Sequence, residues 1–190
     1  MMWNLLHAPG FALIKMMLLV ALAIAAASDL RTRRIPNLLT VPLALVFIIA
    51  HGVCGGTGYA VASLLAWLAW FCLGYLFYRT LAGREIGAGD IKLVMATAAG
   101  IGFTPAAYVT FVSLMLLVVW LFVRWIAQGT ARANFSGLYA WLHATAIPNS
   151  EKVHFRPVGM VDQTPFAPFL LLGALLCYCL QLRGALLAAP

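Results

Sequence analysis

Charged residues are the scarcest class in this sequence. Only 9% of its 190 residues are charged, with 12 Lys and Arg against 5 Asp and Glu. A soluble globular domain carries about 25% charged residues, and a disordered chain combines high charge with few hydrophobic residues. Both classes are therefore excluded. Because 64% of the residues are hydrophobic and mean hydropathy is +0.98, the sequence predicts a polytopic membrane protein.

Cysteine is also rare, and its four copies do not form a metal-binding pattern. Cys54, Cys72, Cys177 and Cys179 lie in apolar surroundings, and the sequence contains no CxxC pair. A structural zinc ribbon needs two such pairs on polar loops. We therefore expect buried thiols that act as small hydrophobic groups, no metal site and no cofactor.

Long runs without charge define where the chain is expected to cross the membrane. At about 1.5 Å per helical residue, the run 38–78 is roughly twice as long as a ~30 Å hydrocarbon core, so it must cross twice. The run 93–123 is interrupted near residue 103 by Gly and Pro. We predict one all-α domain over residues 1–190, with six spans at about 11–27, 36–53, 59–78, 91–103, 106–126 and 165–182.

The basic residues predict the orientation of these spans. All cations except Lys15 and Arg183 lie in the connections after the first, third and fifth spans, so the positive-inside rule makes these connections cytoplasmic. Both termini then lie on the outer, periplasmic side. The basic charge reflects topology, so we expect membrane lipid as a partner and no nucleic acid. A cleavable signal peptide is the alternative for the first span, but its cations follow the apolar run instead of preceding it.

The cytoplasmic loop at 127–164 is the one long connection in this topology. Its Phe135, Leu138 and Tyr139 suggest an amphipathic segment lying on the cytoplasmic face of the membrane. A structureless linker is the alternative.

Two of the five carboxylates abut apolar spans at one level of the membrane. Asp29 ends the first span and Asp90 opens the fourth, with two complete crossings between them. A carboxylate at a bilayer boundary is costly unless it is hydrated or partnered, so a function is the default hypothesis, with helix capping as the alternative. Two close carboxylates act as one acid and one base, as in aspartyl proteases. Gly87 and Gly89, lacking a Cβ, would let an extended peptide approach Asp90.

Three segments of the sequence resemble the type IV prepilin peptidases, a family of GxGD intramembrane aspartyl proteases. They are Asp29 followed by Pro36-Asn37, then Gly87-Ala88-Gly89-Asp90-Ile91-Lys92-Leu93, and finally Pro165-Phe166-Ala167-Pro168-Phe169. The resemblance implies that Asp29 and Asp90 are the catalytic pair of a multi-pass endopeptidase of the bacterial inner membrane. Its substrates would be prepilin or pseudopilin precursors, cleaved after their basic leader at the cytoplasmic face.

The rest of the motifs, by the same resemblance, is expected to bind substrate or shape the active site. These residues are Pro36, Asn37, Gly87, Gly89, Lys92, Pro165, Phe166 and Pro168. The larger bifunctional members of the family carry an N-methyltransferase domain with paired CxxC motifs. Because this sequence has none, it looks like the short, peptidase-only form found with Flp or Tad pilus systems.

Helix dipoles predict which aspartate holds the proton. Asp90 would lie at the positive end of its helix with Lys92 close by, and Asp29 at the negative end of its own, so we expect Asp90 as the base and Asp29 as the acid. Two other functions stay open. One is a noncatalytic membrane subunit of a pilus or secretion assembly, and the other is a proton-coupled transporter, which would usually place its acids at broken helices near mid-membrane.

Overall fold

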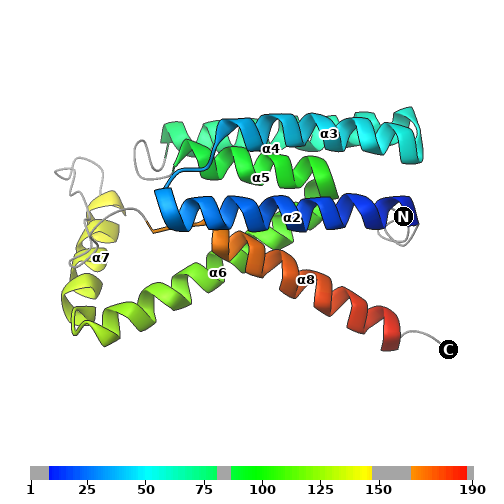
Figure 1. Ribbon diagram of the computed structural model, residues 1–190. Helices are drawn as coiled ribbons and strands as arrows, with labels where there is room; N and C mark the ends of the chain where they lie inside the picture. Colours follow the sequence, from blue (N-terminus) through cyan, green and yellow to red (C-terminus); the bar gives the residue numbers. More distant parts are fainter. Residues whose placement is uncertain (1–8, 81–86, 147–163, 188–190) are drawn as a thin grey trace. The chain divides into compact units, whose positions relative to one another are not determined.

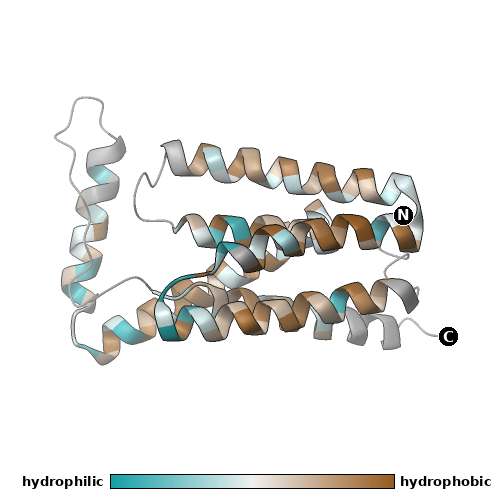
Figure 2. Cartoon of the chain, turned by 45° about the horizontal axis from the view of Figure 1, so that its top comes forward, coloured by the Kyte–Doolittle hydropathy of each residue, from teal (hydrophilic) through white to brown (hydrophobic). Residues whose placement is uncertain are grey.

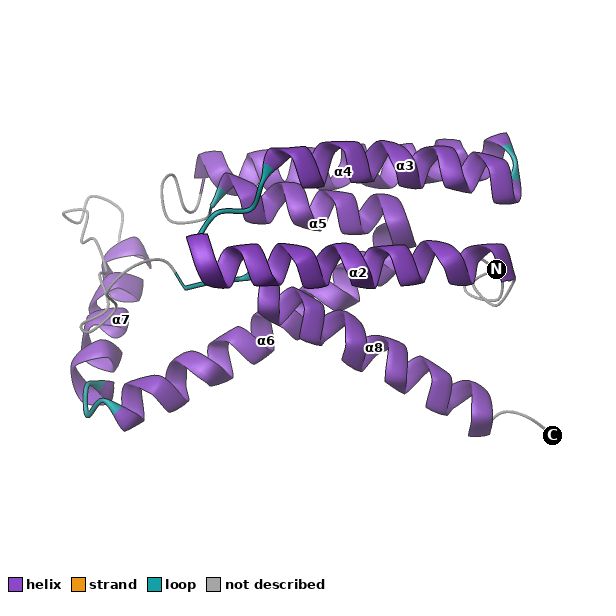
Figure 3. Ribbon diagram, in the orientation of Figure 1, coloured by secondary structure: helices purple, strands orange, loops and turns teal. Residues whose placement is uncertain are grey.

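The chain is helical wherever its structure is described. The computed structural model describes residues 9–80, 87–146 and 164–187, and these residues form helices joined by short connections, without a strand (Figure 3). The prediction of an all-α fold is confirmed. In chain order the helices are α2 (Pro9–Thr32), α3 (Asn37–Gly55), α4 (Thr57–Thr80), α5 (Ala88–Ile101), α6 (Phe103–Ala127), α7 (Ala131–Ala146) and α8 (Ala167–Leu187).

Several of these helices have the length and composition of membrane spans. Among the described residues, three segments are long and apolar enough to cross a membrane: Phe11–Thr32, Thr57–Phe77 and Phe103–Ala127. Two shorter apolar helices cover Leu39–Gly55 and Ala167–Leu180. Figure 2 shows hydrophobic residues over most of the helical surface, with hydrophilic residues gathered at the connection between α2 and α3. This pattern is consistent with a membrane protein.

The described chain divides into two compact units. The first consists of Met1–Leu114 and Pro165–Pro190, and the second of Met115–Thr164. In the first unit, α3, α4 and α5 pack against one another, and α2 packs against α3, α5 and α8 (Figure 1). All three motif segments therefore belong to the first unit.

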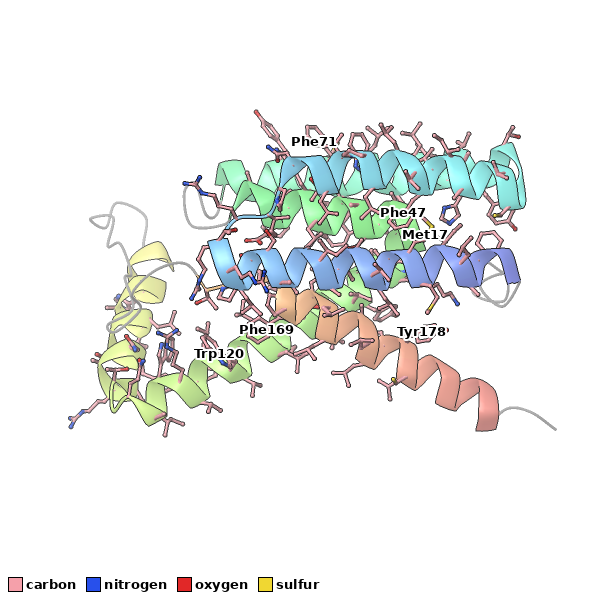
Figure 4. All side chains as sticks on the ribbon, viewed as in Figure 1. Met17, Phe47, Phe71, Trp120, Phe169 and Tyr178 are labelled. Carbon is pink, nitrogen blue, oxygen red and sulfur yellow. The ribbon has the colours of Figure 1, made fainter. Side chains whose placement is uncertain are left out.

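Helix α5 is the short, buried centre of the first unit. Its 14 residues span about 21 Å, less than a ~30 Å hydrocarbon core. Residues 93–100 are all buried. Small residues allow the neighbours to approach closely: Gly100 lies against the ring of Phe47, which α3 directs toward α5 (Figure 4), and Ser63 Oγ donates to the Ala99 carbonyl at 2.6 Å. Protein rather than lipid surrounds this helix.

The second unit contains the helix that the sequence suggested. Residues 131–146 form α7, so the structureless alternative is wrong for this part of the 127–164 connection, whose residues 147–163 lie outside the described part. Phe135 of α7 stacks on Phe122 of α6 with 5.3 Å between ring centroids. Both Phe135 and Tyr139 also expose large apolar surfaces, as expected of a helix at a membrane interface.

The cysteine side chains are more exposed than predicted. Cys54, Cys72 and Cys179 are exposed on their helices and Cys177 is half-buried, so the expectation of buried thiols is wrong. Apolar side chains in a membrane protein can face lipid as well as protein, and sequence hydropathy does not distinguish the two environments.

The crossing of α6 and α8 supplies a test of this packing. A Cβ at Gly173 would overlap Ser113 Oγ and lie 2.9 Å from the backbone oxygen of Val109, which a rotamer change cannot relieve. Gly173→Ala should therefore destabilise the protein by ~1–3 kcal/mol, measured by thermal unfolding in detergent. Gly58→Ala is the control, because nothing lies within 4 Å of its added Cβ, and it should be neutral or slightly stabilising. Equal stability of the two variants would contradict the helix crossing.

Candidate active site

Asp29 is held at the point where α2 ends. Its side chain is only 6% exposed. The Asp29 carbonyl accepts the Arg33 N–H at 2.9 Å, and Arg33 adopts the left-handed conformation, with φ 54°, that stops the helix. The hydroxyls of Ser28 and Thr32 both donate to the Arg34 carbonyl, at 3.0 and 3.3 Å. These bonds fix the turn that carries the chain from Asp29 into α3.

Asp90 lies in the first turn of α5, three residues after the N-cap residue Gly87. Its backbone N–H donates to the Gly87 carbonyl at 3.0 Å, and its carboxylate accepts a hydrogen bond from the Gly87 backbone. The bond made by the Asp90 side chain is the half of a capping box in which the N3 side chain accepts from the N-cap backbone. The helix start therefore fixes the direction of the Asp90 side chain.

The two glycines of the GxGD segment are needed for packing around Asp90. A Cβ at Gly87 would lie 2.9 Å from Asp90 Oδ2, and a Cβ at Gly89 would lie 3.2 Å from the Cβ of Ile35 in the α2–α3 connection. Glycine thus lets the α2–α3 connection pack against the start of α5. Whether these glycines also admit an extended peptide stays a prediction.

The two aspartates interact electrostatically. Burial and the negative charge of Asp29 together raise the pKa of Asp90 to about 6, against the opposing effect of the Gly87 hydrogen bond. Desolvation of Asp90 and the Asp29 charge therefore act against the helix dipole that was expected to keep Asp90 ionised. Which of the two carboxyl groups holds the proton of the pair stays a prediction.

The segment 165–169, the third of the motif segments, forms a hydrogen bond with Asp29 through a backbone group. The Ala167 N–H donates to Asp29 Oδ2 at 3.1 Å, joining residues 138 positions apart. Phe166 is the N-cap residue of α8, since its carbonyl accepts the N–H groups of Phe169 and Leu170 at 3.0 and 3.1 Å. Both Phe166 and Ala167 are buried. Sequence reasoning did not include Ala167 among the site residues, because a backbone donor has no signature in residue type.

The prolines of the motifs lie at helix starts. Pro36 is the N-cap residue of α3, in agreement with its predicted place at the start of a span. Pro168 occupies the second position of α8, where its missing N–H has no helical partner to lose. Pro165 is half-buried just before α8. These prolines lie where α3 and α8 begin, and the polar contact with Asp29 in this region comes from Ala167.

Lys92 bonds to another motif residue instead of to Asp90. Its Nζ donates to Asn37 Oδ1 at 2.8 Å, which ties the first turn of α5 to the first residue of α3. The suggestion that Lys92 favours an ionised Asp90 is therefore not supported. The bond is exposed, so its contribution is to alignment of the two helix starts more than to stability.

Metal ligands do not gather at this site. In the part of the chain that the structure describes, no group of three or more His, Cys, Asp or Glu side chains could hold a metal ion. Asp29 and Asp90 are the two acids that come together, on helices whose other neighbours are apolar.

A pair of interacting carboxyl groups at helix ends, one buried and one half-buried, within a bundle of apolar helices, defines a class of membrane-embedded site. The chain belongs to the type IV leader peptidase family, whose sequence model matches residues 16–122. It is 34% identical over 105 residues to the prepilin leader peptidase/N-methyltransferase of Dickeya chrysanthemi, a match that covers 53% of this chain and 37% of the relative. The chain thus spans little more than a third of that relative's length. No solved structure matches the chain significantly.

The raised pKa of Asp90 predicts a pH-dependent cost to stability. Because the folded value is about 6 and the ordinary value is 3.8, the ionised form is penalised on folding, and stability falls as pH rises through this window. Asp90→Asn keeps the shape and removes the charge, so it should stabilise the protein at pH 8 by up to ~3 kcal/mol.

The same variant compared with the parent at a pH below about 4 serves as the control, since Asp90 is then protonated in both the folded and the unfolded states. Thermal unfolding in detergent at both pH values checks the difference. A stabilisation of equal size at the two pH values would show that burial of charge is not its cause.

Proposed function

We propose that this chain is an aspartic endopeptidase that removes the basic leader from prepilin or pseudopilin precursors. Its catalytic pair is Asp29 and Asp90. The observation that carries the proposal is the electrostatic interaction of buried Asp29 with half-buried Asp90, within the segment that matches the leader peptidase family. The name of the Dickeya relative supports the choice of substrate.

Two coupled carboxyl groups have the chemistry that peptide hydrolysis needs. The ionised carboxylate takes a proton from water, and the resulting hydroxide adds to the carbonyl carbon of the scissile peptide. The protonated carboxyl group then donates its proton to the departing amine as the C–N bond breaks. The pKa of Asp90, raised to about 6, favours this singly protonated state of the pair in mildly acidic solution.

The proposed site lies at the cytoplasmic face of the inner membrane. Asp29 is followed by the exposed cations Arg31, Arg33 and Arg34, and we propose that these side chains stay on the cytoplasmic side near anionic lipid. Six spans in one domain would then leave both termini on the periplasmic side. We propose that the short α5 is tolerated as the fourth span because α2, α3 and α4 pack against it and bury residues 93–100.

Leader cleavage is the activity we propose for the residues in this sequence. The Dickeya relative is named as an N-methyltransferase as well, and the match to it covers 37% of its length. The peptidase form found with Flp or Tad pili is the comparison that we propose.

The alternative functions fit this site less well. A proton-coupled transporter would carry its acids at helix breaks near mid-membrane, whereas Asp29 lies in the last turn of α2 and Asp90 in the first turn of α5. A noncatalytic assembly subunit would have no need of a buried pair of acids, which destabilises the fold.

Substitution of either aspartate tests the catalytic pair. Asp29→Asn and Asp90→Asn should each reduce leader cleavage by at least ~100-fold, the usual worth of a general acid or base. Co-expression with a candidate prepilin, followed by separation of precursor and product on a gel, measures the effect. Glu85→Gln is the matched control and should process normally. Normal cleavage by either Asp variant, at equal membrane content, would refute the assignment.

Chelators and thiol reagents test the chemistry in a second way. Since we assign neither a metal nor a catalytic cysteine, the purified enzyme in lipid should keep its rate in EDTA. Replacement of Cys54, Cys72, Cys177 and Cys179 by Ala should leave cleavage within about 3-fold, because three of the four side chains are exposed and their loss leaves small cavities. Inhibition by EDTA that a divalent ion reverses would contradict the proposal.

A further inference from the structure

We propose that the start of α8 sets the direction of proton transfer in the aspartate pair. The Ala167 N–H holds Asp29 as the ionised base, and Asp90 delivers the proton to the departing amine. This inference rests on the proposed peptidase function and makes Ala167 a positioning residue, because it acts through Asp29 rather than on the substrate.

The geometry at Asp29 favours a charged oxygen. An amide N–H can only donate, so Asp29 Oδ2, at 3.1 Å from the Ala167 nitrogen, must accept. Hydrogen bonds of this kind are stronger when the acceptor is ionised. Ala167 is fully buried and Asp29 only 6% exposed, so water competes little for the bond.

The α8 helix adds its dipole to this bond. Ala167 is the first residue of α8, and the positive end of the helix dipole therefore points at Asp29. Pro168 has no N–H, so the first N–H of the helix is the one that Ala167 gives to Asp29. The end of α2 opposes the charge, but the start of α8 and its direct bond offset that opposition.

Asp90 has the opposite environment. It also accepts one backbone hydrogen bond, from Gly87, but burial and the Asp29 charge outweigh that bond and raise the pKa of Asp90 to about 6. The proton of the pair therefore resides on Asp90 when Asp29 is charged.

Other charged groups around the pair do not reverse this assignment. Lys92 on α5 is bonded to Asn37, and Arg31, Arg33 and Arg34 at the end of α2 are exposed, where water and salt screen them. Residues 164–176, which include the start of α8, contain no ionisable side chain.

In the proposed reaction each aspartate carries out one proton transfer. Asp29 removes a proton from water as the O–C bond to the scissile carbonyl forms. Asp90 gives its proton to the amide nitrogen as the C–N bond breaks, which leaves Asp90 ionised and Asp29 protonated. Transfer of that proton from Asp29 to Asp90 restores the starting state, so neither an electron donor nor a co-reactant is required.

An amide-to-ester replacement at residue 167 tests this role in the full-length protein. Lactic acid in place of Ala167 removes the N–H without adding a side-chain atom. With a prepilin precursor in detergent, the acidic limb of the cleavage rate should move to higher pH by about one unit, a roughly tenfold change that matches one hydrogen bond to a charged group. The matched control is the ester of leucine at position 172, inside α8, which should lower the rate equally at every pH or not at all.

Infrared spectra without substrate separate this inference from the proposed function. Just below pH 6, the parent and Asp29→Asn should both show a protonated-carboxyl band, and Asp90→Asn should lose it. A band that persists in Asp90→Asn but vanishes in Asp29→Asn would overturn the inference, as would an acidic limb that the ester leaves in place. Either result could occur while both Asp→Asn variants abolish cleavage, in which case the peptidase function stands and only the role of α8 fails.

Discussion

The hydrogen bond between the Ala167 N–H and the Asp29 carboxylate is the contact on which the proposed site depends. It joins the end of α2 to the start of α8 across 138 residues of sequence. A buried carboxylate is tolerated only if it has partners, and a backbone N–H at a helix start offers both a donor and a favourable dipole. The fold therefore supports one acid with its last helix and buries the other at the start of α5.

The central helix of the first unit shows why the second acid is perturbed. α5 is surrounded by α2, α3 and α4, and its alanines and glycines bring these helices close. The same burial that packs α5 also removes water from Asp90 and raises its pKa to about 6. The packing of α5 and the raised pKa of Asp90 thus have one cause. The site lowers the stability of the fold locally and is also the proposed source of activity.

Most of the fold, and the choice of Asp29 and Asp90 as the functional acids, could be predicted from the distribution of charge and hydropathy in the sequence. Apolar runs predicted helices close to those observed. The even number of predicted crossings between Asp29 and Asp90 placed the two acids at the same level of the membrane and so predicted that they could meet. The proton assignment from the sequence used only the helices that each acid belongs to, and it left out the contact of Asp29 with the start of α8 and the desolvation of Asp90. Neither effect can be read from the neighbouring sequence. The hydrogen bond to Asp29 comes from a backbone group far along the chain, and the desolvation of Asp90 depends on which helices surround α5.

The central claim is that Asp29 and Asp90 form one site, and cross-linking tests it most directly. In a chain without its four native cysteines, cysteine at positions 29 and 90 should be joined rapidly by a short bis-methanethiosulfonate reagent, as seen by mass spectrometry. A control pair at positions 31 and 90 uses the exposed Arg31 position on the same helix and should react slowly. Equal, slow cross-linking of both pairs would place the two carboxylates apart and contradict the account.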